Sequence, residues 1–179
     1  MFPLFFAHIF GFKNDEILSD LLEKLSQLIS TKFEEIELAH LFLVDMKQNG
    51  ETIQVFLDSD SAVLFEHCVL VSRYLENHIE ENKWMPEKYT IDVSSAGVGT
   101  PLKSVRQYKK NIGRTINVRV KDNHKHIEGE LTKVGEEGIV VTYQEKVKIE
   151  GRKKKELITY NKEINYQDIE KTVVKISFN

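Results

Sequence analysis

Few side chains in this sequence could act together in acid–base or nucleophilic chemistry. Ser94 and Ser95 stand just before Gly97, but no Gly-x-Ser-x-Gly pattern surrounds them. At the end of a predicted strand, their hydroxyls are expected to satisfy backbone groups instead. His67 and Cys68 are adjacent, so on a helix they would point about 100° apart, a poor geometry for joint ligation. Cys68 falls on an apolar stripe, where cysteine acts as a small buried hydrophobe.

Metal-binding and phosphate-binding patterns are also weak. His124 and His126 share one face of a predicted strand and could bind a metal only with ligands from elsewhere. No carboxylate or thiol pattern completes such a site, so we expect a solvated hairpin tip that gains charge below neutral pH. No phosphate-cradling glycine motif occurs. The sequence therefore predicts a protein that is not an enzyme and uses no metal and no cofactor.

Binding is the remaining class of function, and the charge distribution favours it. The chain of 179 residues has a net charge of −3, but residues 1–96 have a net charge of −10 and residues 97–179 one of +7. Such an asymmetry suggests two domains with different partners, and a polyanion for the basic half. The alternative is chance variation of surface charge, with the two halves attracting each other.

The basic residues of the second half are candidate contacts to a phosphate backbone, because clustered Lys and Arg on a small barrel are typical of nucleic-acid binding. The alternative is a solvated face that only keeps the protein soluble. The aromatic residues of this half are scattered and predict no ladder for stacking bases, hence no sequence-specific reading of single strands. The candidates are Lys103, Arg106, Lys109, Lys110, Arg114, Lys121, Lys125, Arg152, Lys153, Lys154 and Lys155.

The composition is that of a soluble globular protein, with 41% hydrophobic and 30% charged residues. A single cysteine excludes an intrachain disulfide and a multi-cysteine zinc site, so we expect a reducing cytoplasm. Residues 1–14 are rich in Phe and too short and interrupted to span a bilayer, so we expect a loosely attached tail. No other segment has the pattern of a targeting or transmembrane sequence.

The elements of the first half predict a small α+β sandwich. Apolar residues recur every three or four positions from a cap at Asn14 or Asp15 to Phe33, which predicts an amphipathic helix. Strands are predicted at 36–46 and 52–58, joined by a hairpin turn centred on Asn49-Gly50. A second helix starts between Asp60 and Phe65 and ends before Pro86, and a strand follows at 89–93. The order αββαβ places both helices against one face of a three-stranded sheet.

The second half begins after a turn-rich joint at residues 94–102, where the charge changes sign. Ser104 caps a short helix that Gly113 closes. From residue 114 the apolar residues recur at every second position, which predicts five short strands with one helical turn before the last. This pattern fits an SH3-like or Sm-like small barrel. The predicted strands lie near 116–120, 127–134 (bending at Gly129), 139–143, 164–166 and 172–178, with a polar stretch at 144–162 and the turn at 167–169.

The predicted organisation is therefore a tail at 1–14, an α+β domain at 15–96, a linker at 97–103 and a barrel at 104–179. In the joint, the run Tyr89-Thr90-Ile91-Asp92-Val93-Ser94-Ser95-Ala96-Gly97, followed by Pro101-Leu102, resembles the signature of the ribosome maturation factor RimP family. The likeness extends from about residue 15 to the C-terminus. Further agreeing positions are Leu57-Asp58, Cys68, Ser72-Arg73, Tyr108, Gly113-Arg114 and Gly129.

Three departures accompany this resemblance. Ala96 stands where the family commonly has proline, and Gly99-Thr100 where it usually has an acidic residue and an arginine. The joint is therefore expected to be more flexible, without a phosphate contact from that arginine. Leu64 occupies a usual helix-capping position. The joint residues that match the motif are Val93, Ser94, Ser95, Gly97, Pro101 and Leu102.

The resemblance implies a cytoplasmic bacterial factor that binds the immature small (30S) ribosomal subunit and promotes its maturation without catalysis. It also implies an SH3-like C-terminal barrel, rRNA contacts and contacts to a ribosomal protein near the decoding centre. We expect a monomer that binds neither a membrane nor a small-molecule substrate. Two alternatives stay open: a protein-interaction adaptor whose barrel binds a peptide, and a small hydrolase that depends on a metal or an activated serine.

Overall fold

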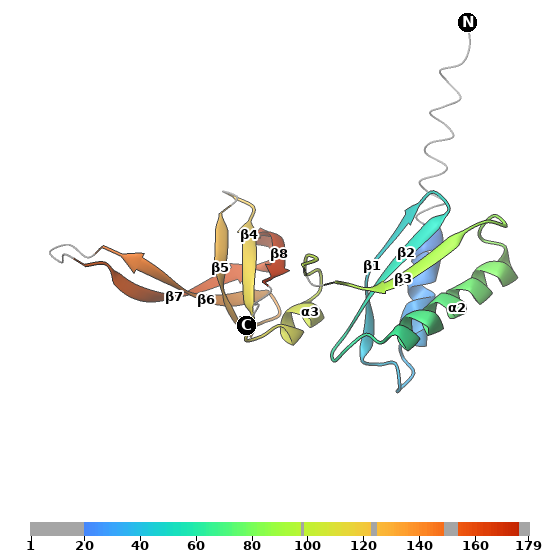
Figure 1. The fold of residues 1–179 in the computed structure, drawn as a ribbon, viewed down its shortest axis with the longest axis horizontal. Coiled ribbons are helices and arrows are strands. Elements are labelled where there is room, and N and C mark those ends of the chain that lie inside the picture. The colour runs from blue at the N-terminus through green and yellow to red at the C-terminus, as the bar shows by residue number, and fades with distance from the viewer. Residues whose placement is uncertain (1–19, 98, 123–124, 149–153, 176–179) are drawn as a thin grey trace, which may run out of the picture. The chain divides into compact units, whose positions relative to one another are not determined.

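A computed structural model describes residues 20–97, 99–122, 125–148 and 154–175. The chain divides into two compact units, a first unit at 1–96 and a second unit at 97–179. Figure 1 shows the elements of both units along the chain. Among the described residues, no helix is long and apolar enough to cross a membrane.

The first unit has the predicted αββαβ order. The described part of α1 covers residues 20–32, followed by β1 (Leu41–Asn49), β2 (Thr52–Ser59), α2 (Phe65–Asn82) and β3 (Thr90–Ser95). The sheet order is β1-β2-β3, with β2 antiparallel to β1 and parallel to β3. The parallel pairing follows from the α2 crossover, which returns the chain to the starting end of β2.

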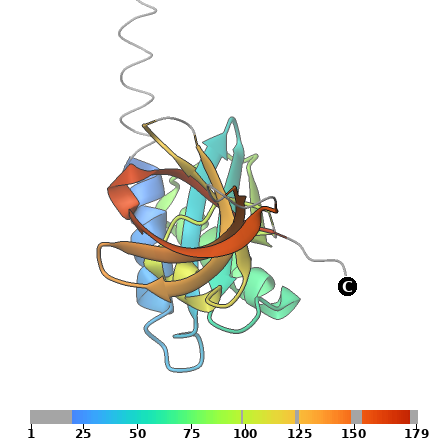
Figure 2. The same ribbon diagram turned by 90° about the vertical axis from the view of Figure 1, so that its left-hand side faces the viewer.

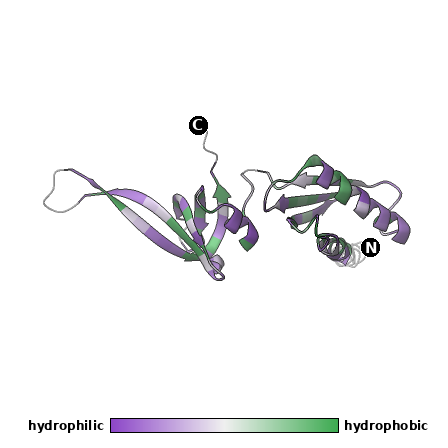
Figure 3. Cartoon of the chain, turned by 90° about the horizontal axis from the view of Figure 1, so that it is seen from below, coloured by the Kyte–Doolittle hydropathy of each residue, from purple (hydrophilic) through white to green (hydrophobic). Residues whose placement is uncertain are grey.

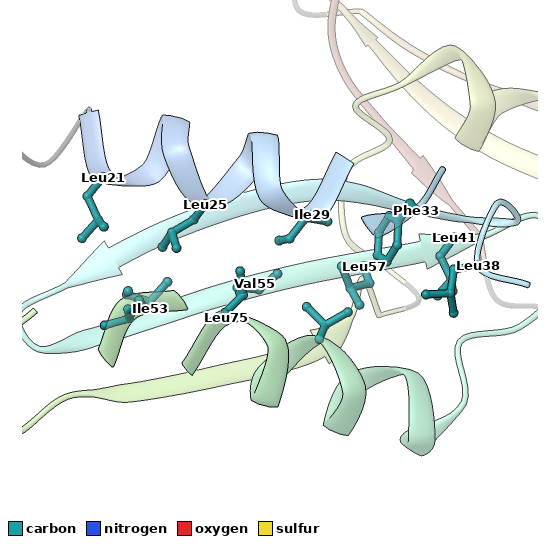
Figure 4. Packing of buried hydrophobic residues seen from close by; sticks show 12 residues of the cluster. Leu21, Leu25, Ile29, Phe33, Leu38, Leu41, Ile53, Val55, Leu57 and Leu75 are labelled. Carbon is teal, nitrogen blue, oxygen red and sulfur yellow. The ribbon is translucent and has the colours of Figure 1, made fainter. Parts of the chain in front are cut away.

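Both helices of the first unit pack on the same face of this sheet. Ile53, Val55 and Leu57 alternate along β2 and are completely buried, as period-two patterning requires of a half-buried strand. They share one core with apolar residues of α1 and α2, and Figure 4 shows the α1 side chains directed toward those of β2. The helical residues of this core are Leu21, Leu25, Ile29, Val71, Leu75 and Ile79.

Two local predictions in the first unit are wrong. The strand predicted from residue 36 begins at Leu41, because residues 33–40 form successive turns that bury Leu38 and leave Ile36 exposed. The hairpin turn is centred on Gly50-Glu51 rather than Asn49-Gly50, since Asn49 still pairs with Thr52. Gly50 has φ of +60°, as a type II′ turn requires at its first central position.

The second unit contains one antiparallel sheet with the strand order β7-β6-β5-β4-β8. Five strands with a single helical turn before the last agree with the predicted pattern, and Figure 2 shows their curvature. The sheet covers a core that includes Ile116, Val118, Leu131 and Val141. Its elements are α3 (Val105–Lys110), β4 (Thr115–Val120), β5 (His126–Val134), β6 (Gly138–Val147), β7 (Glu156–Asn165), the 3-10 turn η1 (Tyr166–Asp168) and β8 (Ile169–Val174).

The polar stretch at 144–162 is mostly β-structure, contrary to the sequence-based prediction. β6 continues to Val147, and β7 pairs with it without interruption from Val147–Glu156 to Gly138–Asn165. We call residues 143–148 and 154–160 the hairpin arm; it extends away from the rest of the sheet and is largely hydrophilic (Figures 1 and 3). Cross-strand backbone bonds form irrespective of side-chain polarity, so a strand with two solvated faces has no apolar alternation to reveal it.

Gly129 lies where β5 changes partners. β5 pairs with β4 through residues 126–130 and with β6 through residues 130–134. A Cβ on Gly129 would meet the carbonyl oxygen of Thr142 and lie 2.9 Å from the Cβ of Tyr143. Glycine is therefore required here by the close approach of the β6 backbone.

Candidate functional site

The joint between the two units is attached at both of its ends. Ala96 donates its N–H to the carbonyl of Leu57 at 2.7 Å, which continues the pairing of β3 with β2. On the other side, Leu102 donates to the carbonyl of Thr172 at 2.8 Å. Between them, Thr100 closes a turn through its hydroxyl, which donates to the Gly97 carbonyl at 2.6 Å. Ser94 and Ser95 form the end of β3, and Pro101 bridges to Val173 of β8.

The helix α3 presents two of the predicted basic residues. Ser104 caps it by accepting from the Gln107 N–H, while the buried Gln107 side chain accepts from the N–H of Lys103 at 2.8 Å. Lys109 and Lys110 are exposed in the last turn, where positive charge stabilises the carbonyl end of the helix dipole. The reciprocal cap fixes where this helix begins and hence where the two lysines are presented.

Arg114 is held next to this helix. Its guanidinium donates to the side-chain carbonyl of Asn111 at 2.9 Å, and the buried Asn111 amide donates to the Gln107 carbonyl at 2.8 Å. Lys109, Lys110 and Arg114 therefore form one basic group at the end of α3, which we call the α3 basic group. Lys103 and Arg106 lie at its start, and both have contacts of their own within the protein.

A second basic group lies on the hairpin arm. Lys154 and Lys155 are exposed just before β7, and the exposed Lys146 and Lys148 lie at the end of β6 and just after it. Val147 pairs with Glu156, so Lys148 and Lys155 flank that last pair of the arm, while Lys146 is opposite Leu157. Lys146 and Lys148 were not among the sequence-predicted residues, because the strand pairing that places them on the same arm as Lys154 and Lys155 was not predicted. Arg152 and Lys153 lie outside the described residues.

The remaining predicted cations lie at the β4–β5 connection. Lys121 and Lys125 are exposed on either side of it, and the Lys121 N–H donates to the Asp168 carbonyl at 2.9 Å. Arg119 on the adjoining strand pairs with Glu170 at 3.1 Å, an interaction that draws its charge toward β8. The sequence-predicted cations thus fall into three places on the second unit rather than one continuous run.

The aromatic residues of the second unit are less scattered than their sequence positions suggest. Tyr143 and Tyr160 face each other across β6 and β7, with ring centroids 5.5 Å apart and an interplanar angle of 24°. Tyr143 also lines a depression of about 380 Å³ together with Lys125 and Lys162. Tyr108 and Tyr166 form another pair among the described residues, with ring centroids 5.4 Å apart; Tyr108 is in the core and the partly buried Tyr166 packs against it. Two pairs do not make a ladder for successive bases, but Tyr143 and Tyr160 provide one partly exposed stack.

Comparison with known proteins covers both units. A family model described as the RimP N-terminal domain matches residues 37–99. The ribosome maturation factor RimP of Flavobacterium psychrophilum is 34% identical over 157 residues, which cover 87% of this chain and 97% of that protein. The protein of the same name from Cytophaga hutchinsonii is 36% identical over 150 residues, covering 79% of this chain and 89% of its own length.

The chain belongs to the ribosome maturation factor RimP family. A further relative of that name, from Christiangramia forsetii, is 34% identical and covers 88% of the chain and 99% of its own length. RimP proteins are non-catalytic assembly factors, and these relatives are bacterial. The match of the RimP N-terminal model ends inside the joint, at residue 99, while these RimP relatives align well beyond it.

In this chain the candidate catalytic and metal-ligating residues make local hydrogen bonds or are partly buried. The His67 ring accepts the Leu64 N–H at 3.1 Å, which satisfies a backbone donor at the start of α2. Burial raises the pKa of the partly buried Cys68 thiol, so its reactive thiolate is disfavoured. His126 is hydrogen-bonded to the Asn117 side chain at 2.9 Å, and His124 lies outside the described residues. Within the described ranges, no three His, Cys, Asp or Glu side chains form a group that could hold a metal.

Proposed function

We propose that this RimP-family chain binds the immature small (30S) ribosomal subunit through rRNA phosphates and ribosomal-protein contacts, and promotes its maturation without catalysis. Family membership supports a role in ribosome maturation, and the division of charge supports two kinds of contact. The acidic first unit is suited to a basic ribosomal protein, and the basic second unit to rRNA.

The observation that carries the rRNA part is the gathering of exposed cations into the α3 basic group and the hairpin arm. Phosphate neutralisation by Lys and Arg releases counterions, so it gives affinity without requiring base-specific contacts. The arm is a two-stranded ribbon whose two sides present the exposed Lys146 and Lys148 and the exposed Lys154 and Lys155. We propose that these residues, with Lys103, Arg106, Lys121, Lys125, Arg152 and Lys153, bind the phosphates.

The ribosomal-protein contact is proposed near the decoding centre, with the chain acting as a cytoplasmic monomer. We propose that the second unit closes into an SH3-like barrel. The support is the strand order β7-β6-β5-β4-β8, in which η1 connects the two outermost strands. We further propose domains at 15–96 and 104–179 joined by the linker 97–103, with 1–14 as a tail.

The test is sedimentation of the purified full chain with small ribosomal subunits at several salt concentrations. The chain should co-migrate with the subunits. The logarithm of the association constant should fall linearly with the logarithm of the salt concentration, because the number of released counterions sets the slope. Replacing Lys109, Lys110, Lys154 and Lys155 by Glu should weaken binding and reduce the slope, by about 0.7–0.9 for each phosphate that the variant no longer neutralises. An unchanged affinity and slope would contradict the phosphate role.

Absence of the wild-type chain from the subunit fractions at every salt concentration would contradict the whole proposal. Replacing Glu136 and Glu137 by Lys gives a control for changed net charge, because these residues form the exposed turn between β5 and β6. If subunit binding fails and a peptide ligand is found for the second unit, the adaptor alternative would take its place.

A further inference from the structure

One end of the first unit exposes apolar side chains to an unusual degree. Ile36 is 94% exposed, Phe65 82% and Leu64 51%. Together we call these three residues the apolar end patch. Large apolar side chains grouped on a surface mark interaction sites more often than single exposed ones do.

The three residues belong to two segments that lie next to each other. Ile36 is in the turns between α1 and β1, and Leu64 and Phe65 begin α2. The rings of His40 and His67 meet edge to face at 5.2 Å, and Asp60 donates its N–H to the His40 carbonyl at 3.0 Å. The two segments that contain the patch residues therefore meet at the end of the sheet where β1 starts and β2 stops, a region that Figure 1 shows as a ribbon.

The start of α2 departs from what helix stability alone would select. Its N-cap position holds Leu64, whose side chain cannot accept a backbone N–H, whereas Ser, Thr, Asp or Asn would satisfy one there. The His67 ring compensates in part by accepting the Leu64 N–H. The first helical residue is Phe65, which gains almost no burial for its size. Leu64 is only half buried and Phe65 is mostly exposed, so this apolar pair gains little from burial and lacks the hydrogen bond of a polar cap.

Carboxylates adjoin the residues of the apolar end patch in the sequence, and we call them the acidic rim. Glu34 and Glu37 stand on either side of Ile36 in the turns, and Glu66 follows Phe65; all three are exposed. Residues 33–40 and 60–67 contain five Asp and Glu and no Lys or Arg. Lys32, which adjoins the first of these segments, pairs with Glu35 at 2.7 Å. An apolar centre inside a rim of one charge selects a partner of the opposite charge.

We propose that the apolar end patch binds a protein segment that presents both apolar and Lys or Arg side chains. Within the function proposed above, on which this inference rests, the segment belongs to a basic protein of the small subunit. The acidic rim disfavours rRNA, because phosphates would face carboxylates. It also disfavours a second copy of this chain, because symmetric docking of the patch would bring the two rims together.

Photocrosslinking identifies the occupant directly. The full chain with benzoylphenylalanine in place of Phe65 is bound to small ribosomal subunits and irradiated, and the crosslinked species are separated and sequenced. A crosslink to a basic ribosomal protein is expected. A crosslink to rRNA, to a second copy or to residues 1–19 of the same chain would overturn the proposal. The absence of any crosslink from bound chain would do the same.

Affinity measurements separate this inference from the proposed function. Ile36→Ser combined with Phe65→Ser should weaken binding to small subunits by about tenfold or more, since each is expected to act as a buried apolar anchor. The affinity of the same variant for protein-free small-subunit rRNA should equal that of the wild type. Glu34→Lys with Glu37→Lys should also weaken subunit binding, whereas Glu81→Lys with Glu87→Lys, exposed at the other end of α2, should not.

Thermal unfolding of each variant checks that the fold is retained, as expected for substitutions of exposed residues. Unchanged subunit affinity in the Ile36 and Phe65 variant would overturn the patch inference and leave the proposed function standing. Equal losses for the two charge-reversal pairs would overturn the role of the acidic rim. If the wild-type chain binds rRNA but no subunit, the proposed function fails, and the patch inference fails with it.

Discussion

Tyr108 in α3 donates its hydroxyl proton to the hydroxyl oxygen of Thr172 in β8 at 2.8 Å, across 64 positions of the sequence. Both residues are almost fully buried, and Thr172 also accepts the Leu102 N–H through its backbone carbonyl. This bond ties the short helix, the end of the joint and the last strand together. The helix that presents Lys109 and Lys110 is therefore held in place by the far end of the chain.

The pairing of Tyr108 with Thr172 can be measured by a double-mutant cycle. Tyr108→Phe and Thr172→Val should each lower the free energy of unfolding by about 1–2 kcal/mol, because each leaves a buried hydroxyl without its partner. The double variant should lose less than the sum of the two. Denaturant unfolding provides the measurement, and Tyr160→Phe on the hairpin arm is the matched control with little expected effect. Strict additivity would show that the two hydroxyls do not act as a pair.

Alkaline pH should destabilise the second unit through the same tyrosine. Burial raises the pKa of Tyr108 above its ordinary value of 10.0, an effect that the hydrogen bond to Thr172 partly offsets. The pKa of Tyr108 is higher in the folded state than in the unfolded state. The neutral phenol therefore contributes its full stabilisation below pH about 10. This contribution is lost as pH rises from there through the folded-state pKa.

Unfolding free energies measured from pH 8 to pH 11 should therefore fall above pH about 10. The decline should be smaller in Tyr108→Phe, which has no phenol to ionise. Burial also raises the pKa of Tyr166, with the neighbouring Tyr108 adding to the effect. Some decline should thus persist in the variant. Identical pH profiles for the two proteins would contradict the assignment to Tyr108.

Gly129 should not tolerate a side chain. Gly129→Ala would place a Cβ against the Thr142 carbonyl and 2.9 Å from both the Tyr143 Cβ and the Val141 Cγ1. The strain of moving β6 away should lower the free energy of unfolding by about 1–3 kcal/mol. Gly135→Ala is the matched control, because its new Cβ would lie 3.5 Å from the nearest neighbour, the Gly138 carbonyl. Similar losses in the two variants would show that the close approach of β6 does not decide the effect.

The two units should fold independently. The residues of one core all come from positions 21–79, and those of the other from positions 108–174. Separate fragments 1–96 and 97–179 should therefore each give dispersed amide spectra and cooperative unfolding. Because Leu102 bonds to Thr172, a second-unit fragment that starts at residue 104 should be less stable than one that starts at 97. A fragment that collapses without dispersed spectra would contradict independence.

Regular alternation and helical spacing allowed most elements to be predicted from the sequence. The stripes of α1 and α2, the buried face of β2 and the strands β4 and β5 follow from local patterning, because each buries one face. The reciprocal cap of α3 is equally local, since Ser104 and Gln107 are three residues apart. Local patterning failed at residues 33–40, where apolar Ile36 and Leu38 resemble a strand but belong to turns.

The candidate site was predicted only in part. Its charges are visible in the sequence, so Lys109, Lys110, Lys154 and Lys155 could be named in advance. Their grouping could not be predicted, because a polar hairpin lacks the alternation of apolar residues that would indicate its strands and their register. The gathering of Lys146, Lys148, Lys154 and Lys155 on one arm and the stacking of Tyr143 on Tyr160 both depend on the pairing of β6 with β7.

The sequence by itself determined the chemistry of the chain: its charge division, its helical and strand periods, and its family motifs at the joint. Only the tertiary structure decided which distant residues meet. The Tyr108–Thr172 bond, the approach of β6 to Gly129 and the apolar end patch all arise from long-range pairing. Local propensity specifies how each segment buries its own face, whereas exposure and register depend on what the rest of the chain places against it.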